Sequence, residues 1–267
     1  FLDVGHGSAV LAEFPNGRKM LIDGGGSFNP EFDLGERVVA PFLWGEKITA
    51  LDTVVLTHPH PDHMNGLPFI LSKFKVNELW LNGQEDDSEP FQQIQEIIRQ
   101  KRLPVFYPKP GWFRMMGDVR VGVLNAHGEE GALEKSSAAW RSYNNGSLVL
   151  RLSRGDQHIL LTADIETPTE KKLLESRVPL GSQILQIPHH GSLSSSTPEF
   201  IRAVRPVYGF ISARPSRHMP LPRPEILQRY ESQGVQLFRT DRDGAITCEL
   251  KPKGWTISSF RQGILIP

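Results

Sequence analysis

Residues 56–66 read Leu-Thr-His-Pro-His-Pro-Asp-His-Met-Asn-Gly and place three imidazoles and one carboxylate within six positions. Residues 52–57 form an apolar, β-branched run, which predicts a strand. Residues 64–74 carry a helical pattern of apolar positions. We therefore expect the cluster in the turn at the C-terminal end of a strand, where open α/β folds place their functional sites.

The spacing of these side chains suits metal binding. His58 and His60 lie two residues apart, so in an extended turn both rings point the same way and can reach one ion. Asp62 and His63 follow a reversal of the chain and can face a second ion. The alternative is a set of histidines gathered in a proline-rich turn without a function. Because the motif and its strand context agree, the sequence predicts half of a two-metal site.

The pattern His-x-His-x-Asp-His at residues 58–63 resembles the signature of the metallo-β-lactamase superfamily. Further segments resemble the C-terminal domain of ComEC-type DNA-internalisation competence proteins, in the same order and over essentially the whole chain. The resemblance implies an α/β fold, the four-layer αβ/βα metallo-β-lactamase sandwich, built by residues 1–267 as a single domain. The segments that carry it are FLDVGHG at 1–7, LIDGG at 21–25, LTHP at 56–59, LLTAD at 160–164, IPHHGS at 187–192 and RTDRDGAI at 239–246.

Length and charge narrow the possible functions. The 267 residues are enough for one large domain with a substantial core. Thirty basic and thirty acidic side chains cancel, so any polyanion must be bound by a local patch. Cys248 is the single cysteine, which excludes an internal disulfide and leaves the redox compartment open. No apolar run approaches the roughly eighteen residues of a membrane span, so we expect a soluble domain.

The context of the domain follows from the resemblance. The chain begins without Met on a strand-like segment, and we expect it to be a piece of a longer membrane protein. The resemblance implies DNA, a polytopic membrane channel domain of the same polypeptide and other competence proteins as partners. It places this domain on the extracytoplasmic side of the cell membrane, without inserting into the bilayer itself.

Asp164 follows the predicted strand 158–161, and its two carboxylate oxygens could bridge two cations. The alternative is that Asp164 caps a helix that begins near Thr167. Resemblance to the Thr-Gly-Asp motif of the superfamily favours the bridge, with Ala163 in place of the glycine. The implied ligands are His58, His60, Asp164 and more weakly Asn144 at site one, and Asp62, His63, Asp164 and His190 at site two.

Asn144 stands where many members of the superfamily carry a histidine, and ComEC-like chains carry asparagine there. The family spacing Asn-x-x-Ser selects Asn144, with Asn145 as the fallback. An amide oxygen is a harder and weaker donor than an imidazole nitrogen. We therefore expect two divalent ions, with Mn²⁺ preferred and Zn²⁺ or Mg²⁺ as the alternatives.

Adjacent histidines end the predicted strand 183–187, and their side chains diverge, so only one should bind the second ion. The family pattern selects His190, with His189 beside it. Asp23, at the end of another strand, either orients a ligating histidine or caps a turn. His6 stands where the family usually has Gln, and we interpret it as a loop histidine, with a further site donor as the alternative.

Two groups of residues are candidates for phosphate contacts. Serines that include Ser192 and Ser195 precede a predicted helix through Val204, as a phosphate cradle or a capped helix start. Arginines that include Arg214 and Arg217 form a local basic excess, although solvated loops explain them singly. His218 resembles a family histidine before Pro, with Met219 intervening here. It would donate to a phosphate oxygen or protonate a leaving alkoxide.

The expected chemistry is hydrolysis of a DNA phosphodiester by water that the metals activate, with Asp62 and His218 as catalytic side chains. The resemblance implies an exo-acting nuclease that degrades the strand not taken up during natural transformation. A second hypothesis is hydrolysis of a small ester, thioester, lactone or β-lactam at the same metals. A third is a non-catalytic DNA-docking module with a vestigial site, against which the retained ligand residues argue.

The remaining pattern alternates strands and helices. Residues 108–116 are rich in proline and aromatics and are predicted as a loop, with Trp112 and Phe113 as core rather than a base-stacking platform. Residues 125–145 lack periodicity and are predicted as a disordered loop or lid. The other strands are expected at 1–4, 9–14, 19–22, 78–81, 105–107, 119–124, 148–152, 207–211, 236–238, 245–250 and 255–259, and helices at 35–43, 90–102 and 224–233.

Overall fold

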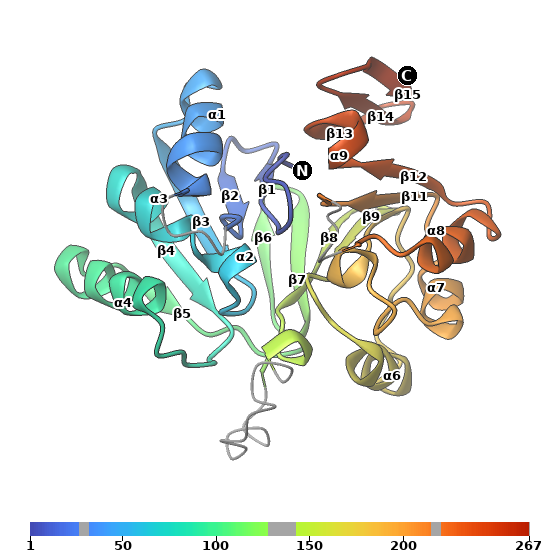
Figure 1. Ribbon diagram of the computed structural model, residues 1–267, viewed down its shortest axis with the longest axis horizontal. Coiled ribbons are helices and arrows are strands. Elements are labelled where there is room, and N and C mark those ends of the chain that lie inside the picture. Colours follow the sequence, from blue (N-terminus) through green and yellow to red (C-terminus); the bar gives the residue numbers. More distant parts are fainter. Residues whose placement is uncertain (27–31, 128–142, 215–219, 267) are drawn as a thin grey trace.

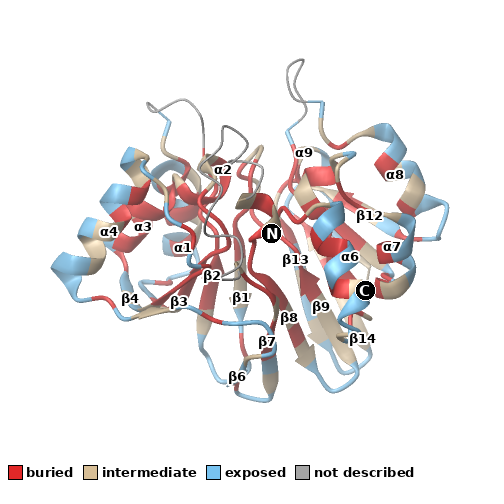
Figure 2. Cartoon of the chain, turned by 90° about the horizontal axis from the view of Figure 1, so that it is seen from below, coloured by how far each residue is buried: buried red, intermediate tan, exposed pale blue. Residues whose placement is uncertain are grey.

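A computed structural model describes residues 1–26, 32–127, 143–214 and 220–266. Two β-sheets pack face to face, and helices cover the outer face of each, so the chain forms four layers (Figure 1). The predicted αβ/βα class is confirmed. Figure 2 shows the consequence for burial, because the strands between the helical layers are largely buried while the outward faces of the helices are exposed.

The first sheet has the strand order β1-β2-β3-β4-β5, and β2 to β5 run parallel. Helices α1, α3 and α4 cover its outer face, and Leu51, Leu67 and Ile94 are among the apolar residues buried between them. The elements are β1 Val10–Glu13, β2 Lys19–Ile22, η1 Gly35–Val39, α1 Ala40–Gly45, β3 Ala50–Leu56, α2 Pro61–Met64, α3 Leu67–Lys73, β4 Lys75–Leu81, α4 Glu89–Lys101 and β5 Val105–Phe106.

The second sheet has the order β12-β11-β10-β9-β8-β7-β6, and β9 to β12 run parallel. Helices α6, α7 and α8 cover its outer face. A separate sheet of β13, β14 and β15 closes the chain. The elements are β6 Phe113–Met116, β7 Val119–Asn125, β8 Val149–Arg154, β9 Gln157–Leu161, α6 Thr167–Glu175, β10 Ile184–Gln186, η3 Pro188–Gly191, α7 Pro198–Val204, β11 Tyr208–Ile211, α8 Pro224–Glu231, β12 Gln236–Arg239, α9 Thr240–Asp243, β13 Ile246–Lys251, β14 Gly254–Ser259 and β15 Gly263–Ile266.

Several predicted elements differ from the structure. The expected loop at residues 108–116 ends in strand β6, which pairs with β7. Trp112 packs on Trp80 and Phe106 between the sheets as expected, but Phe113 is half-exposed and the prediction that it is core is wrong. The expected helix 64–74 is split into α2 and α3. The split follows from Gly66, whose amide donates to the Gly25 carbonyl at 3.0 Å. Neighbouring backbone atoms lie so close to Gly66 that a side chain would not fit.

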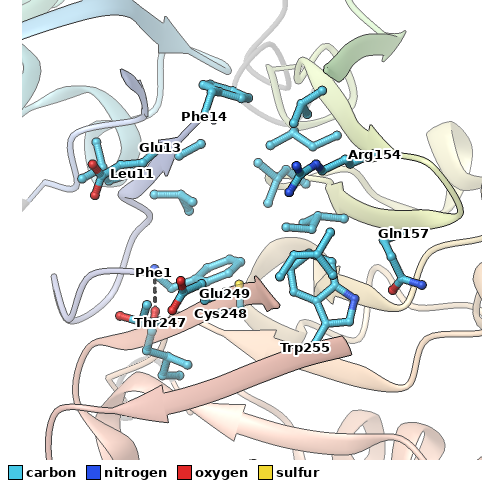
Figure 3. A pocket seen from close by; sticks show the side chains of 18 of the residues that line it. Phe1, Leu11, Glu13, Phe14, Arg154, Gln157, Thr247, Cys248, Glu249 and Trp255 are labelled. Atoms are coloured by element: carbon cyan, nitrogen blue, oxygen red, sulfur yellow. Dashed lines mark hydrogen bonds between the residues drawn. The ribbon is translucent and has the colours of Figure 1, made fainter. Parts of the chain in front are cut away.

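Residues 1–4 form no strand, so the strand predicted there is wrong, but their backbone bonds both to Ala9, next to β1, and to Ile246 of β13. The Phe1 and Ile246 backbones exchange two hydrogen bonds, and the Leu2 amide donates to Ala9. Beside them a cavity of about 640 Å³ opens between β1, the β8–β9 hairpin and β13–β14, as Figure 3 shows. Its lining is mostly apolar, with Glu13 and Arg154 among its polar members, and it contains none of the residues 56–66. The cavity is therefore separate from the histidine-rich segment 56–66.

Candidate metal centre

Asp23 and three of the candidate metal ligands stand where strands end. Asp23 follows β2, His58 follows β3, Asp164 follows β9 and His190 follows β10. All four strands belong to the parallel parts of the two sheets, so their carboxyl ends meet along one edge. The Leu148 amide, just before β8, donates to the Thr57 carbonyl at 3.0 Å and ties the two sheets together there. Rigid strands thus bring side chains that are far apart in sequence to one place.

Four of the predicted ligands form one tight group. Asp62, His63, Asp164 and His190 each contribute an atom, and these atoms all lie within 4.8 Å of one another. His63 Nε2 lies 3.2 Å from Asp164 Oδ1, and His190 Nε2 lies 3.5 Å from the same oxygen. His190 Nε2 also lies 3.4 Å from Asp62 Oδ2. The structure therefore assembles the whole residue set predicted for site two, and all four residues are buried.

Charges inside this group perturb one another strongly. Burial alone would lower the pKa of His190, but the Asp164 carboxylate raises it to about 10. Burial likewise disfavours the charged form of His63, and the carboxylates of Asp164, Asp23 and Asp62 raise its pKa well above its usual value. Against the effect of burial, His190 and His63 keep the pKa of Asp164 well below its usual range. The carboxylates therefore remain anionic and are stabilised by positive charge nearby.

His58 and His60 lie beside this first group. The His58 ring centroid lies 4.7 Å from that of His60 and 4.2 Å from that of His63. Its Nδ1 lies 3.1 Å from Thr57 Oγ1 and 3.3 Å from Ser147 Oγ, which holds the ring in place. Burial and the charge of His63 lower its pKa well below the usual value, so the ring is neutral and has a free lone pair. A neutral imidazole is the form that binds metals.

Unpaired buried atoms show whether these side chains suit a divalent cation. Within the described part of the chain, buried atoms at this edge that have no hydrogen-bond partner include His58 Nε2 and Asn144 Oδ1. His63 Nε2 and His190 Nε2 also lack a hydrogen bond of regular geometry, and their neighbours are carboxylate oxygens at 3.2 Å and 3.4 Å. A buried polar atom left unpaired costs about 1–3 kcal/mol, so such a cluster is unfavourable unless something binds it. Imidazole nitrogens, carboxylates and an amide oxygen are ligands of divalent ions. The residues present fit a metal centre.

Asp23 lies beneath the cluster and is almost fully buried. Its Oδ2 lies 2.7 Å from His63 Nδ1 and accepts from Thr57 Oγ1 at 2.9 Å, while Oδ1 accepts from the Thr57 amide at 2.8 Å. These contacts turn His63 Nε2 toward Asp164. The Asp23 backbone has φ of 60°, in the left-handed region, as do Ala163, His189 and His190. Such strained backbone persists where the surroundings enforce it, often at functional sites.

The two adjacent histidines diverge, as expected. His190 Nδ1 bonds to the Ser212 carbonyl at 3.0 Å, which directs Nε2 to the cluster. His189 Nδ1 lies 3.2 Å from Glu166 Oε1, and its Nε2 lies 3.9 Å from Asp164 Oδ2. Glu166 has no place among the sequence predictions. Its position two residues after Asp164, in the same loop, is the one signal in the sequence that could have found it.

Two alternatives raised by the sequence are decided by hydrogen bonds. Helix α6 begins at Thr167 with Glu166 as its capping residue, and Asp164 faces His63 and His190 instead of capping it. Asn145 is engaged with the start of this helix, where its Oδ1 accepts from the Glu166 amide at 3.2 Å and from Thr169 Oγ1 at 2.9 Å. Asn144 is buried, and its Oδ1 has no hydrogen-bond partner among the described residues, so that oxygen is available to an ion.

The interpretation of His6 as a plain loop histidine is wrong. His6 Nε2 lies 3.5 Å from Asp62 Oδ2, and its ring centroid lies 4.6 Å from that of His190. Burial and the charge of His190 lower its pKa to about 4. Its neighbour Gly7 lets the loop lie directly on the backbone of α2, where the Ser8 amide donates to the Asp62 carbonyl at 3.1 Å.

The residues predicted to contact phosphate differ in how accessible they are to a ligand. Ser195 is buried and its hydroxyl donates to the Pro188 carbonyl at 3.0 Å, so it is not available to a ligand. The amides of Ser196 and Thr197 before α7 donate to the Glu170 carboxylate, so the predicted cradle there is wrong. Ser192 bonds to Ser194 at 3.0 Å. Arg214 is exposed and its side chain lies over Gly5, next to His6. Arg217, His218 and most of the expected lid at 125–145 lie outside the described residues.

Replacing Gly7 by Ala should displace the loop from α2. A Cβ there would stand 2.2 Å from the Asp62 carbonyl oxygen, and φ is +118°. We expect a loss of about 1–3 kcal/mol or more in the free energy of unfolding, measured in urea, and weaker metal binding. Gly17→Ala is the matched control, because Gly17 also has positive φ but nothing within 4 Å. Equal losses in the two variants would show that close packing on Asp62 is not the reason for Gly7.

Comparisons with known proteins agree with this geometry. A family model described as Metallo-beta-lactamase superfamily matches residues 2–213. ComE operon protein 3 of Bacillus subtilis (strain 168) is 28% identical over 270 residues, which cover 97% of this chain and 34% of that protein. Uncharacterized protein YcaI of Escherichia coli (strain K12) is 32% identical, covering 99% and 31%. Competence protein ComA of Neisseria gonorrhoeae is 26% identical, covering 91% and 31%. The chain thus spans about a third of the length of these relatives.

A solved structure shows the same fold in a protein of different chemistry. CmlA, a diiron β-hydroxylase from Streptomyces venezuelae, superposes with a TM-score of 0.54 at 18% identity, over 88% of this chain and 51% of that protein. At this identity the likeness shows the fold alone. Among the described residues of the present chain, helices long and apolar enough to cross a bilayer are absent.

Proposed function

The chain belongs to the metallo-beta-lactamase superfamily, and from this premise we propose that it is a metal-dependent phosphodiesterase that cleaves DNA. The observation that carries the proposal is the buried group of Asp62, His63, Asp164 and His190, with ligand atoms within 4.8 Å of one another. His58 and His60 lie beside it and, with Asn144 as the predicted amide ligand, would hold the other ion. Mn²⁺ is the expected ion, with Zn²⁺ and Mg²⁺ as alternatives.

The side chains have separate tasks in this proposal. Bound divalent cations would supply the positive charge that acidifies water and offsets charge on the phosphate oxygens. Asp62 and Asp164 stay anionic and attract that charge. Asp23 and the Ser212 carbonyl hold the rings of His63 and His190 in position. Arg214, exposed beside the cluster, is suited to contact a phosphate of the substrate.

The biological role rests on the relatives. Competence protein ComA and ComE operon protein 3 match over nearly the whole of this chain, which supports a role in DNA uptake. We infer that the domain degrades the strand that is not transported, as an exonuclease. It would act beside a membrane channel domain of the same polypeptide and other competence proteins, on the extracytoplasmic side of the cell membrane.

A cleavage assay tests this function. Purified protein is incubated with end-labelled single- and double-stranded DNA and with Mn²⁺, Mg²⁺ or Zn²⁺. We expect metal-stimulated cleavage that His58→Ala reduces on the order of a hundredfold, because that ring presents an unpaired Nε2 to the metal. His158→Ala is the control, since His158 is a half-buried histidine of β9 away from the cluster.

Two other outcomes would point to the competing functions. Turnover of a chromogenic ester or lactam without DNA cleavage would identify a small-molecule hydrolase. DNA binding that survives chelation, with no cleavage under any cation, would identify a docking module. Cleavage that is equal in the parent and in His58→Ala would sink the phosphodiesterase proposal as stated.

A further inference from the structure

We propose that His6 is a further ligand of the metal position formed by Asp62, His63 and His190, so that three imidazoles surround this position instead of two. The inference rests on the metal centre of the proposed function and not on its substrate. The sequence favours a plain loop residue at His6 and leaves a further site donor as the alternative. Its position is a result of the fold.

The distances around one oxygen atom carry the proposal. Asp62 Oδ2 lies 3.5 Å from His6 Nε2, 3.4 Å from His190 Nε2 and 3.9 Å from His63 Nε2. Ligand atoms about 2.1 Å from a tetrahedral ion lie roughly 3.4 Å from one another. The three nitrogens are therefore spaced from the shared oxygen much as ligands of a single ion would be.

The backbone holds His6 in this place. Gly5 and Gly7 on either side have φ of +76° and +118°, and the next amide, of Ser8, bonds to the carbonyl of Asp62 itself. The loop is thus anchored on the same residue whose carboxylate His6 faces. The His6 ring, 4.6 Å from that of His190 and inclined at 46° to it, is confined between that ring and Asp62. Its side chain is 19% exposed, more than that of Asp62 or His190, so His6 stands on the outer side of the position.

His6 would be the weakest of the three imidazole ligands. Histidines that bind metals usually donate their second ring nitrogen to an acceptor, which fixes the ring. His63 has Asp23 for this purpose and His190 has the Ser212 carbonyl. In the part of the chain that the structure describes, His6 Nδ1 is buried without a hydrogen-bond partner. Because no acceptor fixes its ring, removing His6 should weaken metal binding less than removing an oriented ligand does, by about tenfold, comparable with the loss of one outer partner.

The additional imidazole also makes the two metal positions unequal. Nitrogen ligands suit Zn²⁺ and Co²⁺ better than Mn²⁺, whereas oxygen ligands suit Mn²⁺ and Mg²⁺. The position at Asp62 would have three nitrogens with His6, while the position at His58 includes the amide oxygen of Asn144. We therefore expect the His6 position to take Zn²⁺ or Co²⁺ first and to discriminate against Mn²⁺.

The test measures metal binding in the absence of DNA. The metal-free protein, His6→Ala and His6→Gln are titrated with Zn²⁺ by calorimetry and with Co²⁺ by visible absorption. We expect about tenfold weaker binding at one of two equivalents in His6→Ala and a changed Co²⁺ spectrum, with His6→Gln intermediate because its amide oxygen can still bind. His158→Ala should match the parent, since that residue is half-buried on β9 and its Nδ1 also lacks a partner among the described residues.

Each outcome bears on the inference. Parent-like affinity and an unchanged Co²⁺ spectrum in both His6 variants would overturn it, as would a parent protein that binds no metal. Thermal unfolding of the metal-free variants, measured by circular dichroism, should match the parent, so that a lost ligand is not confused with a lost fold. A tenfold effect in a protein that cleaves no DNA would leave this inference standing while the phosphodiesterase proposal fails.

Discussion

Replacing Asp164 by Asn is expected to remove tight binding of divalent ions and to abolish metal-stimulated cleavage. Asp164 Oδ1 lies within 3.5 Å of both His63 Nε2 and His190 Nε2, and Oδ2 faces His189 at 3.9 Å. The substitution keeps the size of the side chain but removes one of the anionic charges that face these rings. We expect the loss of affinity to exceed the roughly 10–100-fold that removal of an outer partner costs, because a direct ligand is lost.

The measurement combines metal content after dialysis with cleavage of labelled DNA. Asp118→Asn is the matched control, because Asp118 lies on the surface. Among the described residues, its carboxylate pairs only with Arg154, at 2.7 Å. The control should retain the metal content and the rate of the parent. If Asp164→Asn retained both as well, a carboxylate shared between two ions would be excluded.

Replacing Asp23 by Asn should weaken metal binding without removing a direct ligand. Asp23 accepts hydrogen bonds from the Thr57 amide and hydroxyl and faces His63 Nδ1. An Asn at this place presents an NH₂ group to one of these donors, so the His63 ring loses its orientation. We expect metal affinity to fall about 10–100-fold and the free energy of unfolding to fall by about 1–3 kcal/mol. Asn tolerates the left-handed backbone of Asp23, so strain does not confound the comparison.

Asp52→Asn is the control for this prediction. Asp52 lies on β3, the strand that precedes Thr57, and accepts from the Lys19 amide at 2.9 Å and from Asn77 at 3.4 Å. It is partly exposed and remote from the metal ligands. Calorimetric titration with Zn²⁺ and urea unfolding of both variants separate the two roles. Equal metal affinity in Asp23→Asn and Asp52→Asn would mean that Asp23 does not position His63.

The sequence predicts most of this centre because its residues follow strands. The spacing of His58, His60, Asp62 and His63 by itself indicates metal binding, and the family resemblance adds Asp164 and His190. The structure brings Asp62, His63, Asp164 and His190 within 4.8 Å of one another. Strand prediction succeeds here since alternation and β-branched residues are local properties of the chain.

Other features are not predictable in this way. The cradle expected at Ser195 is filled by Glu170, a carboxylate from the helix before it that reaches the amides of Ser196 and Thr197. Strand β6 ends the segment 108–116, whose prolines predict a loop, and its pairing with β7 is what makes it a strand. Both depend on which segments become neighbours after folding.

The sequence alone determined the α/β layers, the strand ends that carry the metal-binding residues, and the chemical types of the ligands. Only the tertiary structure decided that His6 faces Asp62, that Asn145 bonds to the start of helix α6 while Asn144 Oδ1 stays unpaired among the described residues, and that Asp23 turns His63. The physical reason is that periodicity and motif spacing act within a few residues. The orientation of a ring or carboxylate is set by partners that only chain packing brings into hydrogen-bonding distance.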